Sequence, residues 1–174
     1  MNIFVLHNNP SIAADMLCDK HVPKMVVESA QMMASACIRH GASPNAMPKT
    51  KAGTPYKGGY HNHPCTIWAG ESRDNYFWLA NHASRLCSEY EFRFGGCEHA
   101  CKRPIYLMAD KLNNLIPDGG MTPFAQAMPD EYKSDDAVSA YRNYYFCEKA
   151  AFAKWDRGRD APLWWNRYLS DSLV

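Results

Sequence analysis

Three side chains able to do acid–base or nucleophilic chemistry follow one another at helical spacing near the start of the chain: His21, Lys24 and Glu28. At 100° per residue they fall within a narrow arc, while most other positions of residues 20–38 are apolar. Such a helix is buried, and its polar stripe must face a cleft or other polar groups, because isolated buried charge is costly. We therefore predict a catalytic cleft. In it Glu28 is an ionised carboxylate, His21 or His82 transfers protons, and Lys24 binds phosphate or acts as an amine nucleophile.

A second polar stripe runs along the helix expected over residues 66–94. Its members that we expect to bind substrate are Asn75, Trp78, His82, Glu89 and Arg93. Two packed helices with such stripes can turn them toward each other, which would gather both sets of side chains in one cleft. The alternative is that the charged residues form plain helix salt bridges, such as Lys24 with Glu28, and a solvated face.

Five residues outside these stripes complete the predicted substrate-binding set: Asp19, Lys20, His61, His63 and Arg142. The types of His61, His63 and His82 would also suit zinc or a non-haem metal. We expect no bound metal, because the His-x-His pair has no matched partner motif. Hydrogen bonding within the loop or phosphate contact is the alternative role of this pair.

The elements that must position these residues are predicted to be mostly helices. We expect a compact single-domain helical bundle over residues 1–174, with a short extended segment at 3–6 that could form a buried strand. Asp19 is the expected cap of the second helix, with Pro23 in its first turn. The expected helices cover about 11–18, 20–40, 66–94 with a break near Gly70, 101–115 and 136–156.

Long connections separate these helices. Residues 41–65 form a Gly-, Pro- and Lys-bearing loop, residues 116–135 form a Pro/Gly-rich connection, and the aromatic tail at 161–165 is expected to be irregular. The last long helix interleaves aromatic and cationic residues, a pattern that can stack on exposed bases. For Tyr141, Phe152 and Trp155 we expect core packing instead.

Composition excludes several classes of protein. Hydrophobic residues make up 47% of the chain and the net charge is only +1, so any nucleic-acid contact must use a local patch. The seven cysteines, odd in number and without a CxxC pair, are expected to be reduced. No signal peptide or membrane span is apparent, so we expect a cytoplasmic protein. Without GxGxxG, Walker, GxSxG or HExxH motifs, we expect no cofactor.

Short motifs resemble a known family, the pyrimidine-dimer DNA glycosylases of the phage endonuclease V type. Asp19-Lys20-His21, followed seven residues later by Glu28, resembles one helix of that family. The segment beginning Thr66-Ile-Trp-Ala-Gly is similar to its second conserved block, and Pro162-Leu-Trp-Trp to its aromatic tail. The chain also resembles a widespread phage protein family with Asp-Lys-His, Asn-His-Pro-Cys and Ala-Met-Pro-Asp-Glu-Tyr segments.

The resemblance implies an all-helical domain in which the amino-terminal α-amine attacks the sugar C1′ to form a Schiff base. Glu28 matches the glutamate that serves this step, and His21 matches a histidine that holds the DNA or sugar. Two positions depart from the family pattern: Asn2 stands where the family has threonine, and Val27 where it has arginine. The nucleophile is therefore left open between the α-amine, Lys24 and Lys20.

Together these features predict a phage-type enzyme acting on a nucleobase or nucleotide, in the cytoplasm of the host cell. The most specific version is a pyrimidine DNA glycosylase/lyase acting on damaged or modified DNA, in repair or modification. DNA or a nucleotide is the expected partner. The alternatives are a non-catalytic nucleotide- or nucleic-acid-binding protein, and a His-ligated metal enzyme.

Overall fold

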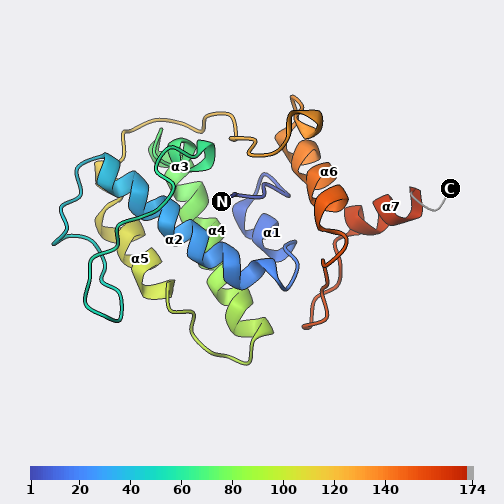
Figure 1. The fold of residues 1–174 in the computed structure, drawn as a ribbon, viewed down its shortest axis with the longest axis horizontal. Coiled ribbons are helices and arrows are strands. Elements are labelled where there is room, and N and C mark those ends of the chain that lie inside the picture. The colour runs from blue at the N-terminus through green and yellow to red at the C-terminus, as the bar shows by residue number, and fades with distance from the viewer. Residues whose placement is uncertain (172–174) are drawn as a thin grey trace.

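Two long helices, α2 (His21–Arg39) and α4 (Arg73–Arg93), form the centre of the molecule in a computed structural model that describes residues 1–171 (Figure 1). No β-strand forms within this range, so the prediction of a mostly α fold is confirmed. The remaining elements are α1 (Pro10–Asp15), α3 (Pro64–Ala69), α5 (Lys102–Lys111), α6 (Ala137–Lys149) and α7 (Leu163–Asp171), with 3₁₀ turns η1 (Asn113–Leu115) and η2 (Asp130–Tyr132).

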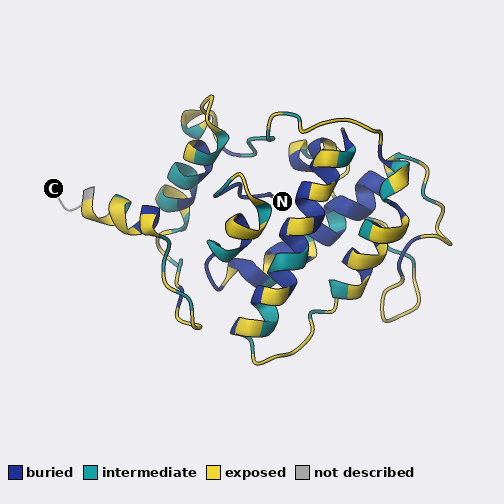
Figure 2. Cartoon of the chain, turned by 180° about the vertical axis from the view of Figure 1, so that it is seen from behind, coloured by how far each residue is buried: buried dark blue, intermediate teal, exposed yellow. Residues whose placement is uncertain are grey.

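Helix α2 is buried over most of its girdle, as its sequence predicts. Val22, Val26, Met33 and Cys37 have no exposed surface and pack into the core. Helices α1, α3 and α5 pack around the central pair of α2 and α4, and Figure 2 shows their buried faces turned inward. Only one narrow side of α2 is left for polar residues, and this side carries the predicted stripe.

Several predicted helix boundaries are confirmed. Helix α2 ends just before Gly41, which has a positive φ of 90°. The break near Gly70 separates α3 from α4, and the Ser72 side chain accepts the Asn75 N–H to cap α4. Asp136 caps α6 by accepting the Val138 N–H.

Asp19 does not cap α2, contrary to the prediction. The residue before the helix is Lys20, whose side chain forms no capping bond. The Asp19 carboxylate instead accepts hydrogen bonds from Arg93 and from the backbone N–H of Asp156. Arg93 is almost fully buried, and leaving its charge unpaired would cost more free energy than leaving the first turn of α2 without a side-chain cap.

Three other structural predictions need correction. Residues 3–6 are buried but form no strand, because Phe4 has a left-handed φ of 35° and Leu6 N–H turns back to the Phe4 carbonyl at 2.7 Å. The helix predicted to reach residue 156 ends at Lys149. The aromatic tail is helical, and Trp164 and Trp165 of α7 pack against Tyr145.

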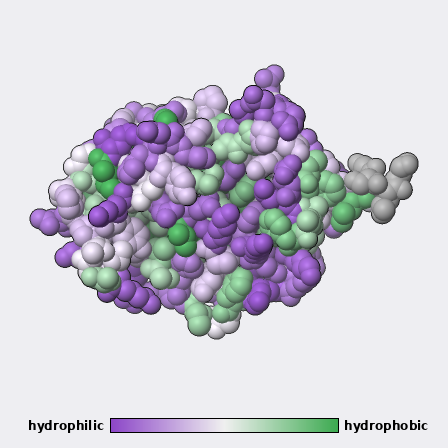
Figure 3. Space-filling model, in the orientation of Figure 1, coloured by the Kyte–Doolittle hydropathy of each residue, from purple (hydrophilic) through white to green (hydrophobic). Residues whose placement is uncertain are grey.

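The two long connections lie largely outside regular structure, as predicted. Residues 116–135 cross one side of the molecule to reach α6 and bring Ala127 to the amino terminus (Figure 1). The face seen in Figure 3 is mostly hydrophilic, with scattered apolar residues. None of the described helices is long and apolar enough to cross a membrane.

Candidate active site

A pocket of about 310 Å³ lies at the polar stripe of α2, where the amino terminus meets α6 and the residues after it. It contains all three predicted catalytic residues and several from other elements. Its lining is Met1, Asn2, Phe4, Lys20, His21, Lys24, Glu28, Tyr144, Lys149 and Phe152. We call it the Glu28 pocket.

The Glu28 carboxylate lies between two amines. Its Oε2 accepts the backbone N–H of Asn2 at 2.9 Å and lies 3.8 Å from the α-amino nitrogen of Met1. Its Oε1 lies 3.6 Å from Nζ of Lys24. The Glu28 side chain is only 13% exposed, whereas that of Lys24 is 60% exposed. A largely buried carboxylate that lies beside two amines can accept a proton from either of them.

Asn2 fixes the amino terminus in this position. Its Oδ1 accepts the N–H groups of Ile3 and Phe4, at 2.8 and 3.1 Å, and its Nδ2 donates to the Ala127 carbonyl at 2.8 Å. The Met1 side chain is held from behind by the Thr66 hydroxyl, which donates to the sulfur at 3.3 Å. All hydrogen-bonding atoms of the Asn2 side chain are therefore used to hold the start of the chain at Glu28.

His21 is a buried member of the pocket wall. Its Nδ1 lies 2.6 Å from the Tyr145 hydroxyl, and its ring stacks on Phe4 with centroids 4.9 Å apart. Burial, with further contributions from Lys24, Lys149 and Lys20, lowers the pKa of His21 to about 3. His21 therefore enters any reaction at pH 7 as a neutral imidazole.

Five residues of the pocket lining were not predicted as site residues from the sequence: Asn2, Phe4, Tyr144, Lys149 and Phe152. The ammonium of Lys149 lies 4.8 Å from the centre of the Tyr144 ring, and that of Lys20 lies 4.3 Å from the Phe152 ring. The alternation of aromatic and cationic residues over 141–155 was the sequence pattern that could have predicted the last three of these five residues as part of the site. Phe152, expected in the core, is only partly buried and forms a pocket wall, whereas Tyr141 and Trp155 are buried.

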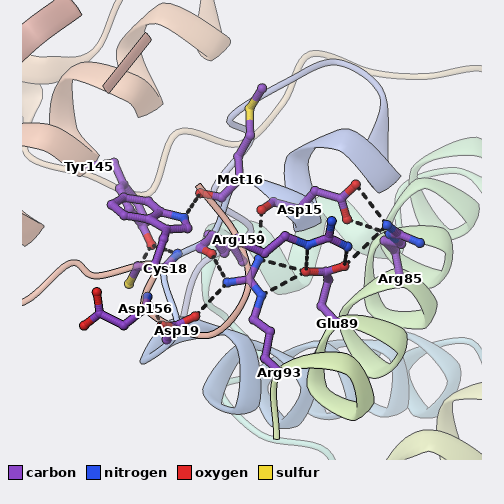
Figure 4. A network of polar contacts seen from close by, with 12 residues as sticks. Asp15, Met16, Cys18, Asp19, Arg85, Glu89, Arg93, Tyr145, Asp156 and Arg159 are labelled. Carbon is purple, nitrogen blue, oxygen red and sulfur yellow. Dashed lines mark hydrogen bonds and ion pairs between the residues drawn. The ribbon is translucent and has the colours of Figure 1, made fainter. Parts of the chain in front are cut away.

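The two polar stripes do not face each other, so the predicted common cleft is wrong. Glu89 and Arg93 of α4 turn toward α1 and the residues after it, where they are almost fully buried (Figure 4). Glu89 contacts Arg93, Arg85 and Arg159 at 2.8, 3.3 and 2.6 Å. Arg93 also donates to the Leu17 carbonyl at 2.7 Å.

The Glu89 carboxylate is ionised within this network. Burial alone would raise its pKa, but hydrogen bonds from Arg159 and Arg93 outweigh burial, and its pKa lies below the ordinary value. Glu89 and Arg93 thus join α4 to the start of α2 and to the chain after α6. They do not reach the Glu28 pocket.

The other α4 residues of the predicted set are also internal. Asn75 binds the Trp68 carbonyl and the Thr122 hydroxyl, at 2.9 and 2.7 Å. The rings of Trp78 and His82 stack with centroids 5.2 Å apart. Both ring nitrogens of His82 lack a partner, and burial lowers its pKa to about 3. Tertiary packing against α1 and the 116–135 connection explains this polar face.

The two loop histidines and Arg142 lie outside the lining of the Glu28 pocket. His63 caps α3 by accepting the Cys65 N–H. Burial and the Met1 amine lower its pKa while Glu28 raises it, so His63 lies within electrostatic reach of the pocket. His61 is exposed. Arg142 donates to the Leu6 carbonyl at 2.9 Å and lies over the Trp164 ring.

The metal alternative finds no support in this arrangement. His61 is exposed, His63 caps a helix and His82 is enclosed in the core. Within residues 1–171, no three His, Cys, Asp or Glu side chains are grouped so that they could hold a metal ion.

Comparison with known proteins identifies a family for the first part of the chain. A family model described as Pyrimidine dimer DNA glycosylase matches residues 1–101, which include Met1, His21, Lys24 and Glu28. No curated protein and no solved structure matches the chain. Because the matched residues make up more than half of the sequence, the chain belongs to the pyrimidine dimer DNA glycosylase family.

Proposed function

We propose that this protein cleaves the N-glycosidic bond of a damaged or modified pyrimidine nucleotide in DNA, and that the reaction takes place in the Glu28 pocket. The observation that carries the proposal is the placement of a partly buried carboxylate within 4 Å of two amines. Family membership supports DNA as the substrate. The proposal places the enzyme in the cytoplasm of a phage-infected host.

The nucleophile in this proposal is the α-amine of Met1. The start of the chain is held at Glu28, because Oε2 accepts the Asn2 N–H at 2.9 Å and lies 3.8 Å from the α-nitrogen of Met1. Lys24 is the weaker choice because its side chain is 60% exposed and its amine is open to water. We assign Lys24 and Lys20 to phosphate binding at the pocket mouth.

The reaction then runs as follows. The neutral Met1 nitrogen attacks C1′ of the deoxyribose, the bond from C1′ to the base breaks, and the base leaves with the electron pair and takes up a proton. Glu28 accepts the proton that the attacking nitrogen loses. The C1′–O4′ bond then breaks, O4′ takes up the proton held by Glu28, and an imine forms between Met1 and C1′. Loss of a C2′ proton to Glu28 breaks the C3′–O bond, which eliminates the 3′ phosphate and cuts the strand. Water finally hydrolyses the imine to restore the amine and release the sugar aldehyde.

The side chains of the pocket wall are of the types that bind a nucleotide flipped out of the DNA duplex. Phe4, Tyr144 and Phe152 offer aromatic surface on which a base can stack. Lys20, Lys24 and Lys149 place positive charge around them, although the net charge of the chain is only +1. Neutral His21, fixed by Tyr145, positions the sugar or base by hydrogen bonding.

The test is N-glycosidic bond cleavage and strand cleavage on a duplex that contains one cyclobutane pyrimidine dimer. The cut base stays joined to its neighbour through the cyclobutane ring, so base release is measured after photoreversal of the dimer. We expect wild type to release the base and cut the strand, and Glu28→Gln to be slower by about 10²- to 10⁴-fold, because it cannot accept the proton. The matched control is Glu98→Gln, which removes an exposed carboxylate paired with Arg103. Wild type that binds the duplex without cleaving it would instead favour a non-catalytic binding protein.

A further inference from the structure

A second hollow of about 450 Å³ lies directly beside the Glu28 pocket. The two hollows share Lys20 and Phe152, so the Phe152 ring is a wall common to both. The remaining lining of the second hollow is Asp19, Lys154, Asp156 and Arg157. A polymer that places one unit in the Glu28 pocket can therefore place its neighbouring unit in this second hollow.

Positive charge is left uncompensated in the second hollow. Lys20, Lys154 and Arg157 are exposed, and none of them forms an ion pair within residues 1–171. Of the two carboxylates, Asp19 is already neutralised by buried Arg93, whose Nη1 lies 3.1 Å away. Asp156 alone opposes the three cations. The hollow therefore favours an anion.

The cations after α6 are carried by residues 154–159, which have no helix of their own but are firmly attached. Asp19 holds this segment twice, because its N–H donates to the Lys154 carbonyl at 2.9 Å and its Oδ2 accepts the Asp156 N–H at 2.7 Å. Trp155 donates to the Met16 carbonyl, and Arg159 donates to Glu89 at 2.6 and 3.0 Å (Figure 4).

This attachment gives a physical role to the buried network of Figure 4. Glu89 and Arg93 lie too far into the core to contact a substrate, yet they fix the backbone from which Lys154 and Arg157 project. A cationic segment that is ordered before binding loses less conformational entropy when an anion arrives.

We propose that the second hollow binds a DNA phosphate next to the reacting nucleotide, through Lys154, Arg157 and the shared Lys20. The inference rests on the proposed function for its choice of DNA as the ligand. A planar guanidinium beside ammonium groups suits a phosphate, which offers several acceptor oxygens. Lys154 and Arg157 lie outside the residues that match the family, so this subsite is additional to what the family match supplies.

The experiment measures binding without turnover. The parent is Glu28→Gln, titrated by fluorescence anisotropy with a short dimer-containing duplex over a series of salt concentrations. We expect Lys154→Ala/Arg157→Ala in this parent to weaken binding by about tenfold. The slope of log affinity against log salt should fall by about 1, which corresponds to one phosphate.

A matched pair controls for the loss of charge. Lys111→Ala/Arg103→Ala removes the same two residue types from exposed ion pairs with Asp110 and Glu98. We expect this control to keep the affinity and salt slope of the parent. A second arm changes the DNA instead: a neutral methylphosphonate replaces each phosphate flanking the dimer in turn. One of these should weaken the parent but not the Lys154/Arg157 variant.

The outcomes separate this inference from the proposed function. If the Lys154/Arg157 variant has the affinity and salt slope of the control, or if every methylphosphonate affects it as much as the parent, the subsite is rejected while the proposed reaction stands. A parent that binds no DNA overturns both proposals. Normal DNA binding with the expected salt slopes, but no base release by wild type, overturns the reaction alone.

Discussion

Asn2 donates its backbone N–H to Oε2 of Glu28 at 2.9 Å, and the same oxygen lies 3.8 Å from the α-nitrogen of Met1. The side chain of Asn2 is bonded at the same time to the backbone of Ile3, Phe4 and Ala127. Asn2, which stands where the resemblance to the family predicts threonine, therefore contacts the site through its backbone and fixes the start of the chain through its side chain. It places the Met1 amine beside Glu28.

Asn2→Ala should lower both stability and activity. The substitution removes the acceptor for two buried N–H groups and the donor to Ala127, which we expect to cost about 1–3 kcal/mol in the free energy of unfolding. The kcat for strand cleavage should fall further than KM rises, because the amine is no longer held at Glu28. Asn45→Ala, at an exposed loop position, is the control for both measurements. Unchanged kcat in Asn2→Ala would mean that this residue does not position the nucleophile.

Glu89→Gln should be strongly destabilising although it lies outside the pocket. The carboxylate neutralises Arg85, Arg93 and Arg159, and its removal leaves buried Arg93 short of a partner, with an expected loss of about 3–5 kcal/mol in chemical denaturation. Glu98→Gln, in an exposed pair with Arg103, should leave the denaturation midpoint almost unchanged. Similar midpoints for the two variants would contradict the structural role given to the network.

His82→Leu should reduce the sensitivity of the fold to acid. The folded-state pKa of His82, about 3, lies below the ordinary 6.5, so its contribution to stability is complete above pH 6.5 and is lost as the pH falls toward 3. Relative to wild type, the variant should gain about 2 kcal/mol between pH 7.5 and 5. Removing two unpartnered nitrogens should also leave it no less stable at pH 7.5. Exposed His61→Leu is the control, and an equal acid response in both variants would refute the prediction.

His21→Gln should lower kcat/KM without changing the shape of its pH profile between pH 5.5 and 7.5. With a pKa of about 3, His21 is already neutral throughout this range and contributes no titration step there. The loss should come from the missing contacts to Tyr145 and Phe4. A step near pH 6.5 that is present in wild type and absent in the variant would show that His21 titrates during the reaction.

The sequence predicts the position and burial of a helix well where these depend only on residues within or next to that helix. The apolar girdle of residues 20–38 and the break at Gly70 both depend on neighbouring residues, and both are confirmed. The apolar run at 3–6 predicts that these residues are buried, but it does not determine whether they form a strand or a turn. Its left-handed turn at Phe4 depends on the Asn2 side chain and on distant Ala127.

The predicted site residues of α2 lie together in one pocket, whereas those of α4 do not, and the difference again depends on whether the partners are near in the sequence. His21, Lys24 and Glu28 share one helix, so their spacing was enough to bring them together. The polar face of α4 has an equally clear spacing, but its partners are Asp15, Leu17 and Arg159, which no periodicity connects to it. A stripe on a helix shows that polar partners exist. It does not show whether they belong to the protein or to a substrate.

The most direct test of the central claim is borohydride trapping on a dimer-containing oligonucleotide, followed by peptide mapping of the covalent adduct. The reductant converts the imine between protein and C1′ into a stable amine. We expect one adduct, on the α-nitrogen of Met1, no adduct when the amino terminus is extended by Gly-Ser, and adduct formation slowed as much as cleavage when Glu28 is replaced by Gln. An adduct mapped to Lys24, or full trapping by the extended protein, would contradict the claim that the amino-terminal amine beside Glu28 is the nucleophile.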